Sequence, residues 1–140
     1  WLRTVRRSQE AFLVALSEPG AVEAAVAAAL SLHDFARDHP ADARLLAAVR
    51  REDLVHTASG DELRRVNARL PEVMGDLARR LYGRATPAAV ERTTFAVVDL
   101  PLGAVRRHLV EGAPLPRTLR PQLEAAVRAA LAPQPHPKES

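Results

Sequence analysis

The sequence lacks cysteine and isoleucine altogether and has few aromatic residues, which account for 4% of its 140 positions. Because there is no thiol, disulfides, thiolate metal sites and cysteine nucleophiles are excluded. No apolar run reaches the roughly 18 residues that a membrane span requires, and the first residues do not form a signal peptide. These absences predict a cytoplasmic protein with no membrane partner. An apolar content of 47% suffices for the core of one domain.

Lysine is nearly absent too: Lys138 is the only one, and every other basic residue is an arginine. The net charge of +3 is small. The arginine doublets, among them residues 6–7 and 106–107, have acidic residues nearby, and few aromatic side chains could stack on bases. Solvated helix faces therefore explain the doublets better than direct contact with nucleic acid.

Helix-forming residues dominate the chain, and no segment alternates with period two for long enough to form a strand. We expect an all-α fold of about six helices in an antiparallel bundle. The helices are predicted to run to about Leu16, from Pro19 or Gly20 to about Asp38, from Pro40 to before Ser59, from the capping box at Ser59 to Tyr82, from Thr86 to Gly112, and over residues 119–131. Residues 133–140 are rich in proline and polar side chains, which predicts a disordered tail.

Three prolines carry further expectations. Pro71 lies in the middle of the predicted fourth helix and should bend it, because a proline removes a hydrogen bond and its ring clashes with the preceding turn. Thr86-Pro87 should form an N-cap followed by a first-turn proline. Pro101 should leave the carbonyl of Val97 unpaired and bend its helix.

The helix that contains Pro101 is unlike its neighbours, because its apolar residues from Phe95 to Val105 fall on every side. A helix that is apolar all round must be covered all round, and a second copy of the chain could cover its outer face. This argument predicts a homodimer in which the last two long helices form a four-helix bundle. The expected interface residues are Val97, Val98, Leu100, Pro101, Gly103, Ala104, Leu123 and Val127. Asp99 in the same run would need a partner such as Arg92 or Arg106, or would cap backbone groups beside the bend.

Motifs for catalysis and metal binding are missing. There is no H-x-x-x-H pair, no G-x-S-x-G and no glycine-rich phosphate loop, so we expect neither an enzyme nor a cofactor or metal site. Polar residues do occur on apolar helix stripes, namely Gln9, His33, Asn67 and Asp99. A mostly apolar cavity with a few such groups is typical of a small-molecule site, and backbone partners for each group are the alternative.

Two segments resemble the C-terminal domain of tetracycline-repressor-like (TetR) family transcriptional regulators: "DFARDHPADARLLAAVRREDL" (34–54) and "VDLPLGAVRRHLVEGAPLP" (98–116). The resemblance extends over residues 2–132 in the order and lengths of the helices. It implies an effector-binding and dimerisation domain over residues 1–132, which controls operator DNA binding by an N-terminal helix-turn-helix domain. The apolar stripe is already in phase at the first residues, so we expect that domain to lie upstream of this chain.

The resemblance further implies an unidentified small-molecule inducer and a connecting helix over residues 1–17 that relays its binding. Our hypothesis for the ligand-binding residues is a set expected to point inward: Phe12, Leu16, Leu30, His33, Asn67, Met74 and Phe95. Gln9 is a further polar candidate. The alternatives are a stand-alone helical protein-interaction module without a ligand site and, third, a small helical enzyme.

Overall fold

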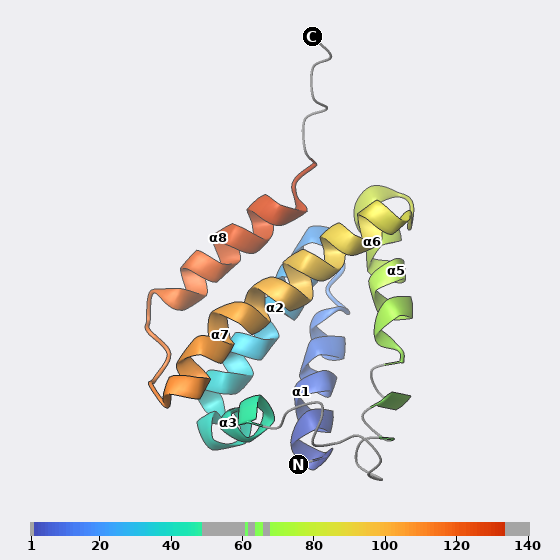
Figure 1. The fold of residues 1–140 in the computed structure, drawn as a ribbon. Coiled ribbons are helices and arrows are strands. Elements are labelled where there is room, and N and C mark those ends of the chain that lie inside the picture. The colour runs from blue at the N-terminus through green and yellow to red at the C-terminus, as the bar shows by residue number, and fades with distance from the viewer. Residues whose placement is uncertain (1, 49–60, 62–63, 66–67, 134–140) are drawn as a thin grey trace.

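The computed structural model describes residues 2–48, 61, 64–65 and 68–133, and within this part of the chain all regular structure is helical (Figure 1). The all-α prediction is therefore confirmed for the described residues. The elements are α1 (Leu2–Ala15), α2 (Ala21–Asp38), α3 (Pro40–Ala48), α5 (Leu70–Tyr82), α6 (Pro87–Thr94), the π-helix η2 (Phe95–Asp99), α7 (Leu100–Glu111) and α8 (Leu119–Leu131). The predicted disordered tail lies outside the described residues except for its first position, Pro133.

Helix α2 lies at the centre of the fold and contacts α1, α3, α5, α7, α8 and η2. It can do so because much of its surface is alanine: Ala24, Ala25, Ala28 and Ala29 are fully buried. Short side chains let neighbouring helices approach closely, so a single helix can be covered on several sides. The continuous run of α6, η2 and α7 crosses in front of α2 in Figure 1, with α8 beside it.

Several predicted helix boundaries are found in the structure. The hydroxyl of Thr86 accepts a hydrogen bond from the backbone N–H of Ala89 at 3.2 Å, and Pro87 occupies the first turn of α6. Gly112 ends α7 in the left-handed conformation (φ 68°), and Gly83 ends α5 in the same way (φ 75°). These are the capping residues that helix termini favour.

The prediction of one long helix bent at Pro71 is wrong. Residues 68 and 69 form a turn, α5 begins at Leu70, and Pro71 lies in its first turn. A proline is favourable there, because the first-turn N–H groups have no partner within the helix in any case. The predicted capping box at residues 59–62 lies mostly outside the described residues, and only Asp61 of it is described, as helical.

Pro101 changes the helix in a specific way. Because it has no N–H to offer the carbonyl of Val97, the preceding turn widens into the π-helix η2, whose closing bond runs from the N–H of Leu100 to the carbonyl of Phe95. The helix thus continues from α6 into α7 through a wider turn. The bend and the unpaired carbonyl of Val97 stay predictions, and what the structure adds is the π-helical turn before Pro101.

Side chains from distant parts of the sequence donate hydrogen bonds to backbone carbonyls at the C-terminal ends of three helices. Arg80 donates hydrogen bonds to the carbonyls of Leu16 (2.9 Å) and Glu18 (2.8 Å) after α1, and Arg44 donates to Gly112 at 3.0 Å after α7. At the end of α8, Tyr82 donates to the carbonyl of Leu131 at 2.8 Å and Arg92 donates to that of Ala132 at 3.4 Å. Carbonyls at helix ends lack partners within the helix, so each contact satisfies a group that would otherwise need water.

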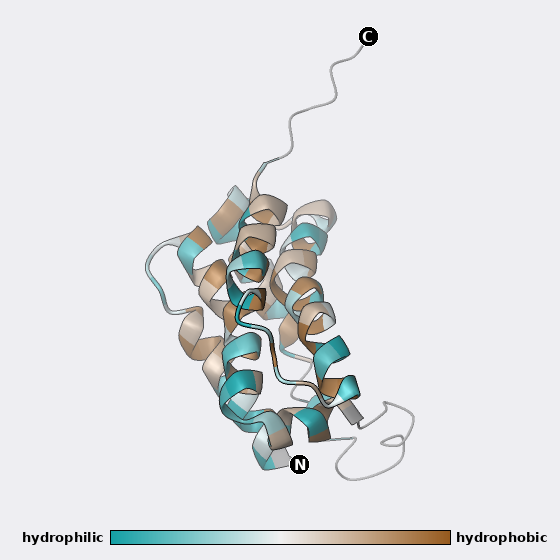
Figure 2. Cartoon of the chain, turned by 90° about the vertical axis from the view of Figure 1, so that its left-hand side faces the viewer, coloured by the Kyte–Doolittle hydropathy of each residue, from teal (hydrophilic) through white to brown (hydrophobic). Residues whose placement is uncertain are grey.

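Hydrophobic and hydrophilic positions alternate along the helices in Figure 2. The larger buried cluster combines α2, α5, η2 and α8, and a smaller one lies where α2, α3 and α7 meet. No helix in the described part of the chain is long and apolar enough to cross a membrane.

Candidate functional site

Four of the predicted ligand-binding residues come together in the larger core cluster. Leu30 on α2 and Met74 on α5 are buried, at 4% and 1% exposure. Phe12 and Leu16, at the end of the first helix, are half-buried and pack against this cluster. The inward direction of these side chains could be predicted from their helical spacing, because large apolar residues that recur along one side of a helix pack against the core. The four residues thus come from the end of α1, from α2 and from α5.

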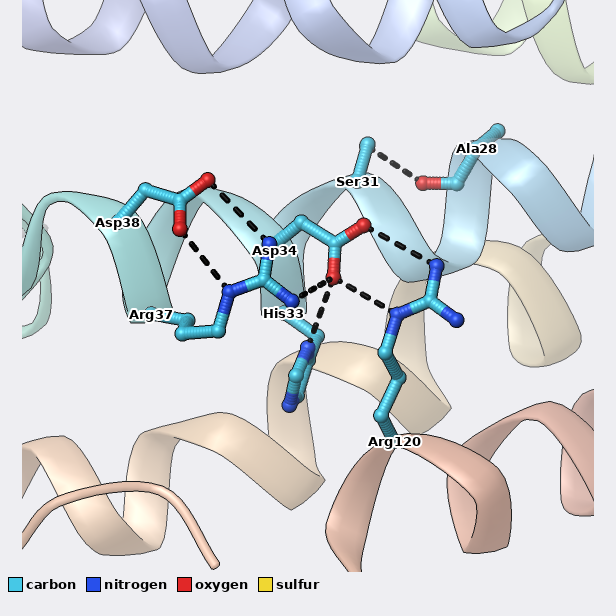
Figure 3. Close-up of polar contacts among 7 residues, drawn as sticks. All are labelled: Ala28, Ser31, His33, Asp34, Arg37, Asp38 and Arg120. Carbon is cyan, nitrogen blue, oxygen red and sulfur yellow. Dashed lines mark hydrogen bonds and ion pairs between the residues drawn. The ribbon is translucent and has the colours of Figure 1, made fainter. Parts of the chain in front are cut away.

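His33 lies one helical turn beyond Leu30 and is also buried, at 3% exposure. Its Nδ1 lies 3.0 Å from Oδ1 of Asp34. Since a carboxylate only accepts hydrogen bonds, the geometry assigns the proton to Nδ1 and leaves Nε2 as the second polar atom of the ring. In Figure 3 the ring is directed to the side of α2 on which α7 and α8 lie, away from α1. It could orient a ligand through Nε2.

Asp34 is the centre of a polar cluster that joins α2 to α8 (Figure 3). The Nε of Arg120 donates to Oδ1 of Asp34 at 2.9 Å, and its Nη2 donates to Oδ2 at 3.2 Å. Arg37 approaches the same carboxylate at 3.4 Å and pairs with Asp38 at 2.9 Å. A bidentate arginine–carboxylate pair fixes both distance and orientation, so Asp34 sets the position of the first turn of α8 against α2.

The pKa of Asp34 reflects opposing influences. Partial burial raises it, but hydrogen bonds from Arg120 and His33, together with the charges of Arg120 and Arg37, lower it by more. The net result is a pKa below the ordinary value for an aspartate. The carboxylate therefore stays charged at neutral pH and keeps its hydrogen bonds to both α8 and His33.

The other predicted ligand-binding residues are placed differently. The inward direction expected for Phe95 is wrong: its side chain is 47% exposed in the single chain. Asn67 lies outside the described residues. Gln9 is half-buried on α1.

Most residues expected at the dimer interface lie in or against the core of this chain itself. Val97, Pro101, Leu123 and Val127 are buried where η2, α7 and α8 pack together and onto α2. Val98, Leu100 and Ala104 are half-buried against the same core, and Gly103 alone is exposed. These side chains thus already have neighbours within the chain, and a contact of any of them with a second copy stays a prediction.

The outward positions of α6, η2 and α7 form a continuous exposed line, which we call the outer stripe. Its members recur every three or four residues: Ala88, Glu91, Phe95, Asp99, Leu102, Arg106 and Val110. Three of them are large apolar residues, with Phe95 and Leu102 47% exposed and Val110 69% exposed. Exposed apolar residues that follow one line on one helix are typical of a protein–protein contact.

Sequence reasoning missed the polar cluster around Asp34. Asp34 and Arg120 are 86 positions apart, and nothing in either local pattern links them. The only available signal was that Arg120 lies in the first turn of a predicted helix, where a positive charge is unfavourable unless an acidic residue lies nearby.

Among the residues that the structure describes, no three His, Asp or Glu side chains form a group that could hold a metal ion. What the arrangement offers chemically is an apolar contact region with one buried imidazole, and a separate exposed stripe with both charges and apolar groups. When the chain is compared with protein-family models, with curated proteins and with solved structures, it matches none of them.

Proposed function

We propose that this chain is the effector-binding and dimerisation domain of a TetR-like transcriptional repressor. The observation that carries the proposal is the pairing of α6–η2–α7 with α8 on one side of α2, with exposed Phe95, Leu102 and Val110 on the outer stripe. Two neighbouring helices of one chain and their equivalents in a second chain would make a four-helix bundle. This is the arrangement that the resemblance implies for the last two long helices.

The proposed effector site lies where α1, α2 and α5 meet. Phe12, Leu16, Leu30 and Met74 would supply apolar contacts. His33, whose ring lies on the side of α2 towards α7 and α8, would supply a polar contact through Nε2 to a ligand that extends past Leu30. Sites for small molecules are mostly apolar with few polar groups, which fits this set. Arg80 on α5 donates hydrogen bonds to the carbonyls of Leu16 and Glu18, just after α1. A ligand that moves α5 relative to α2 would therefore also move α1.

The mechanism we propose is a shift between two states of a dimer. Helix-turn-helix dimers bind half-sites roughly 34–36 Å apart, so a dimer with another separation of its DNA-binding domains binds the operator weakly. A ligand that prefers this second state releases DNA to the extent of its differential affinity for the two states. In this proposal α1 transmits the change to a helix-turn-helix domain encoded upstream.

The DNA-binding part is tested by reading the coding sequence upstream of Trp1. We expect a helix-turn-helix domain there that is continuous in frame with this chain. An upstream region that encodes no such domain would overturn the repressor proposal.

The effector part is tested by thermal-shift screening of small apolar and aromatic compounds, followed by titration of a compound that raises the melting temperature. Phe12→Ala and His33→Ala are expected to weaken binding of that compound at least about tenfold, since each removes a direct contact. Leu13→Ala, at the neighbouring exposed position, is the matched control and should bind like the wild type. Unchanged affinity in both test variants would move the site elsewhere.

A second candidate function is a helical protein-interaction module without a ligand site. The close packing of Leu30 and Met74 at 4% and 1% exposure favours it. In that case the thermal-shift screen yields no compound, while the chain still self-associates through the outer stripe.

A further inference from the structure

The outer stripe has an uneven distribution of charge along its length. Its acidic members, Glu91 and Asp99, lie towards the N-terminal end, and its basic member, Arg106, lies towards the C-terminal end. None of the three forms an ion pair with any residue in the described parts of the chain. A helix face with opposite charges at its two ends complements a second copy of itself only when the two copies run in opposite directions.

The spacing of the stripe also defines a register. Asp99 and Arg106 lie about two helical turns apart, so an antiparallel pair that joins Asp99 to Arg106 in both directions has its two-fold axis between Leu102 and Gly103. In this register Phe95 of one copy lies opposite Val110 of the other, and both are exposed apolar residues.

The same register places a large residue against a small one at the axis. Leu102 would meet Gly103 of the second copy, whose missing side chain leaves room for it: a Cβ built on Gly103 has no neighbour within 4 Å in the single chain. Alternation of large and small residues lets facing helices approach closely. Charge, apolar contact and size thus agree on a single alignment, whereas parallel alignment would oppose like charges.

We propose that two copies of this chain pair antiparallel through the outer stripe, with Asp99 of each copy bound to Arg106 of the other. The proposal specifies the dimerisation that the proposed function contains and rests on it for the presence of a dimer. The pairing gives Asp99, an exposed acid in an otherwise apolar run, a defined role as one half of a reciprocal contact that sets the register.

The test is a charge reversal followed by analytical ultracentrifugation over a range of concentrations. Asp99→Arg and Arg106→Asp each create two contacts between like charges and should each raise the dimer Kd by at least about tenfold. The double variant Asp99→Arg/Arg106→Asp restores opposite charges at both contacts and should return the Kd to within about threefold of the wild type. Circular dichroism verifies that each variant keeps its helical content.

A matched control uses the exposed ion pair between Asp76 and Arg79 on α5, whose atoms lie 3.0 Å apart. Asp76→Arg and Arg79→Asp change the net charge by the same amounts as the test variants, and they should leave the Kd unchanged. If all four single variants weaken the dimer alike, or if the double variant does not recover, the proposed pairing is wrong.

The same measurements separate failure of this inference from failure of the proposed function. A wild-type dimer that ignores the reversals at positions 99 and 106 refutes the register and leaves dimerisation intact. A wild-type chain that stays monomeric at tens of micromolar refutes both the register and the dimer, while the effector site is still judged by the titration described above.

Discussion

The charged residues of α8 and those of the outer stripe lie on neighbouring helices and are used differently. On α8, Arg120 pairs with Asp34 and Arg128 pairs with Glu23, both in bidentate fashion and both across to α2. On the outer stripe, Asp99 and Arg106 have no ion-pair partner among the described residues. The comparison teaches that this fold pairs charges where two of its own helices meet and leaves them unpaired on the face proposed to meet another molecule.

The largest expected effect comes from breaking the contact between α8 and α2. Leu123→Ala should lower the free energy of unfolding by about 2–5 kcal/mol, because Leu123 is buried at 4% exposure and its loss leaves a cavity. Urea unfolding followed by circular dichroism measures the change. Leu13→Ala, at a 49% exposed position on α1, should cost less than about 1 kcal/mol. Equal losses in the two variants would contradict the packing of α8 described above.

The next effect concerns the ion pair that joins the same two helices. Asp34→Asn should lower the free energy of unfolding at pH 7 by about 1 kcal/mol, since hydrogen bonds to charged groups are strong but this carboxylate is partly exposed to solvent. The folded-state pKa of Asp34 lies below its ordinary value, so its contribution is present above about pH 4 and is lost as the pH falls through the folded-state pKa.

Unfolding curves collected at several pH values test this expectation. Stability of the wild type should fall more steeply below about pH 4 than that of Asp34→Asn. Asp76→Asn, which removes an exposed pair within α5, is the control and should follow the wild-type pH profile more closely. Parallel profiles for all three proteins would mean that Asp34 has no special role in holding α8.

The smallest effects come from two glycines and sharpen the comparison on the side of the outer stripe. Gly103 lies in the helix α7 with open space beside it, so Gly103→Ala should stabilise the single chain by up to about 1 kcal/mol through helix propensity. The same methyl group should weaken the dimer, because in the proposed register it meets Leu102 of the second copy. We therefore expect Gly103→Ala to raise the free energy of unfolding of the single chain and also to raise the Kd of the dimer.

Gly112→Ala is the counterpart on the same helix. Gly112 has φ 68°, a conformation that costs other residues about 1 kcal/mol, so the substitution should destabilise the chain. Its effect on association should be small, because Gly112 lies beyond the end of the outer stripe. A stabilising effect of Gly112→Ala would contradict the left-handed cap.

Local patterns were sufficient for the fold class and for several helix boundaries. Thr86, Pro87 and Gly112 act through backbone groups next to them in the chain, so their effect can be predicted without knowledge of distant segments. Pro71 shows the limit of this reasoning. An apolar stripe on both sides of a proline suits one bent helix or two separate ones, and the turn at residues 68–69 separates them here.

Burial was harder to predict where side chains are small. Helix α2 is covered on several sides because of its alanines, yet alanine is a weak hydrophobic signal, and the larger Val22 of the same helix is 46% exposed. The reverse error occurred at Phe95, which its strong hydrophobicity assigned to the interior but which is 47% exposed. Pairing of Asp34 with Arg120 depends on tertiary structure alone and could not be predicted from local sequence.

The side chains that hold the helix ends make the opening of one helix depend on another. Tyr82 and Arg92 bond to the last carbonyls of α8, so the final turn of α8 cannot fray without releasing side chains at the end of α5 and in α6. Slow amide hydrogen exchange in this turn would then report the opening of three helices together. A disturbance that enters the chain at α5 therefore reaches α8 at its C-terminal end as well as through the core.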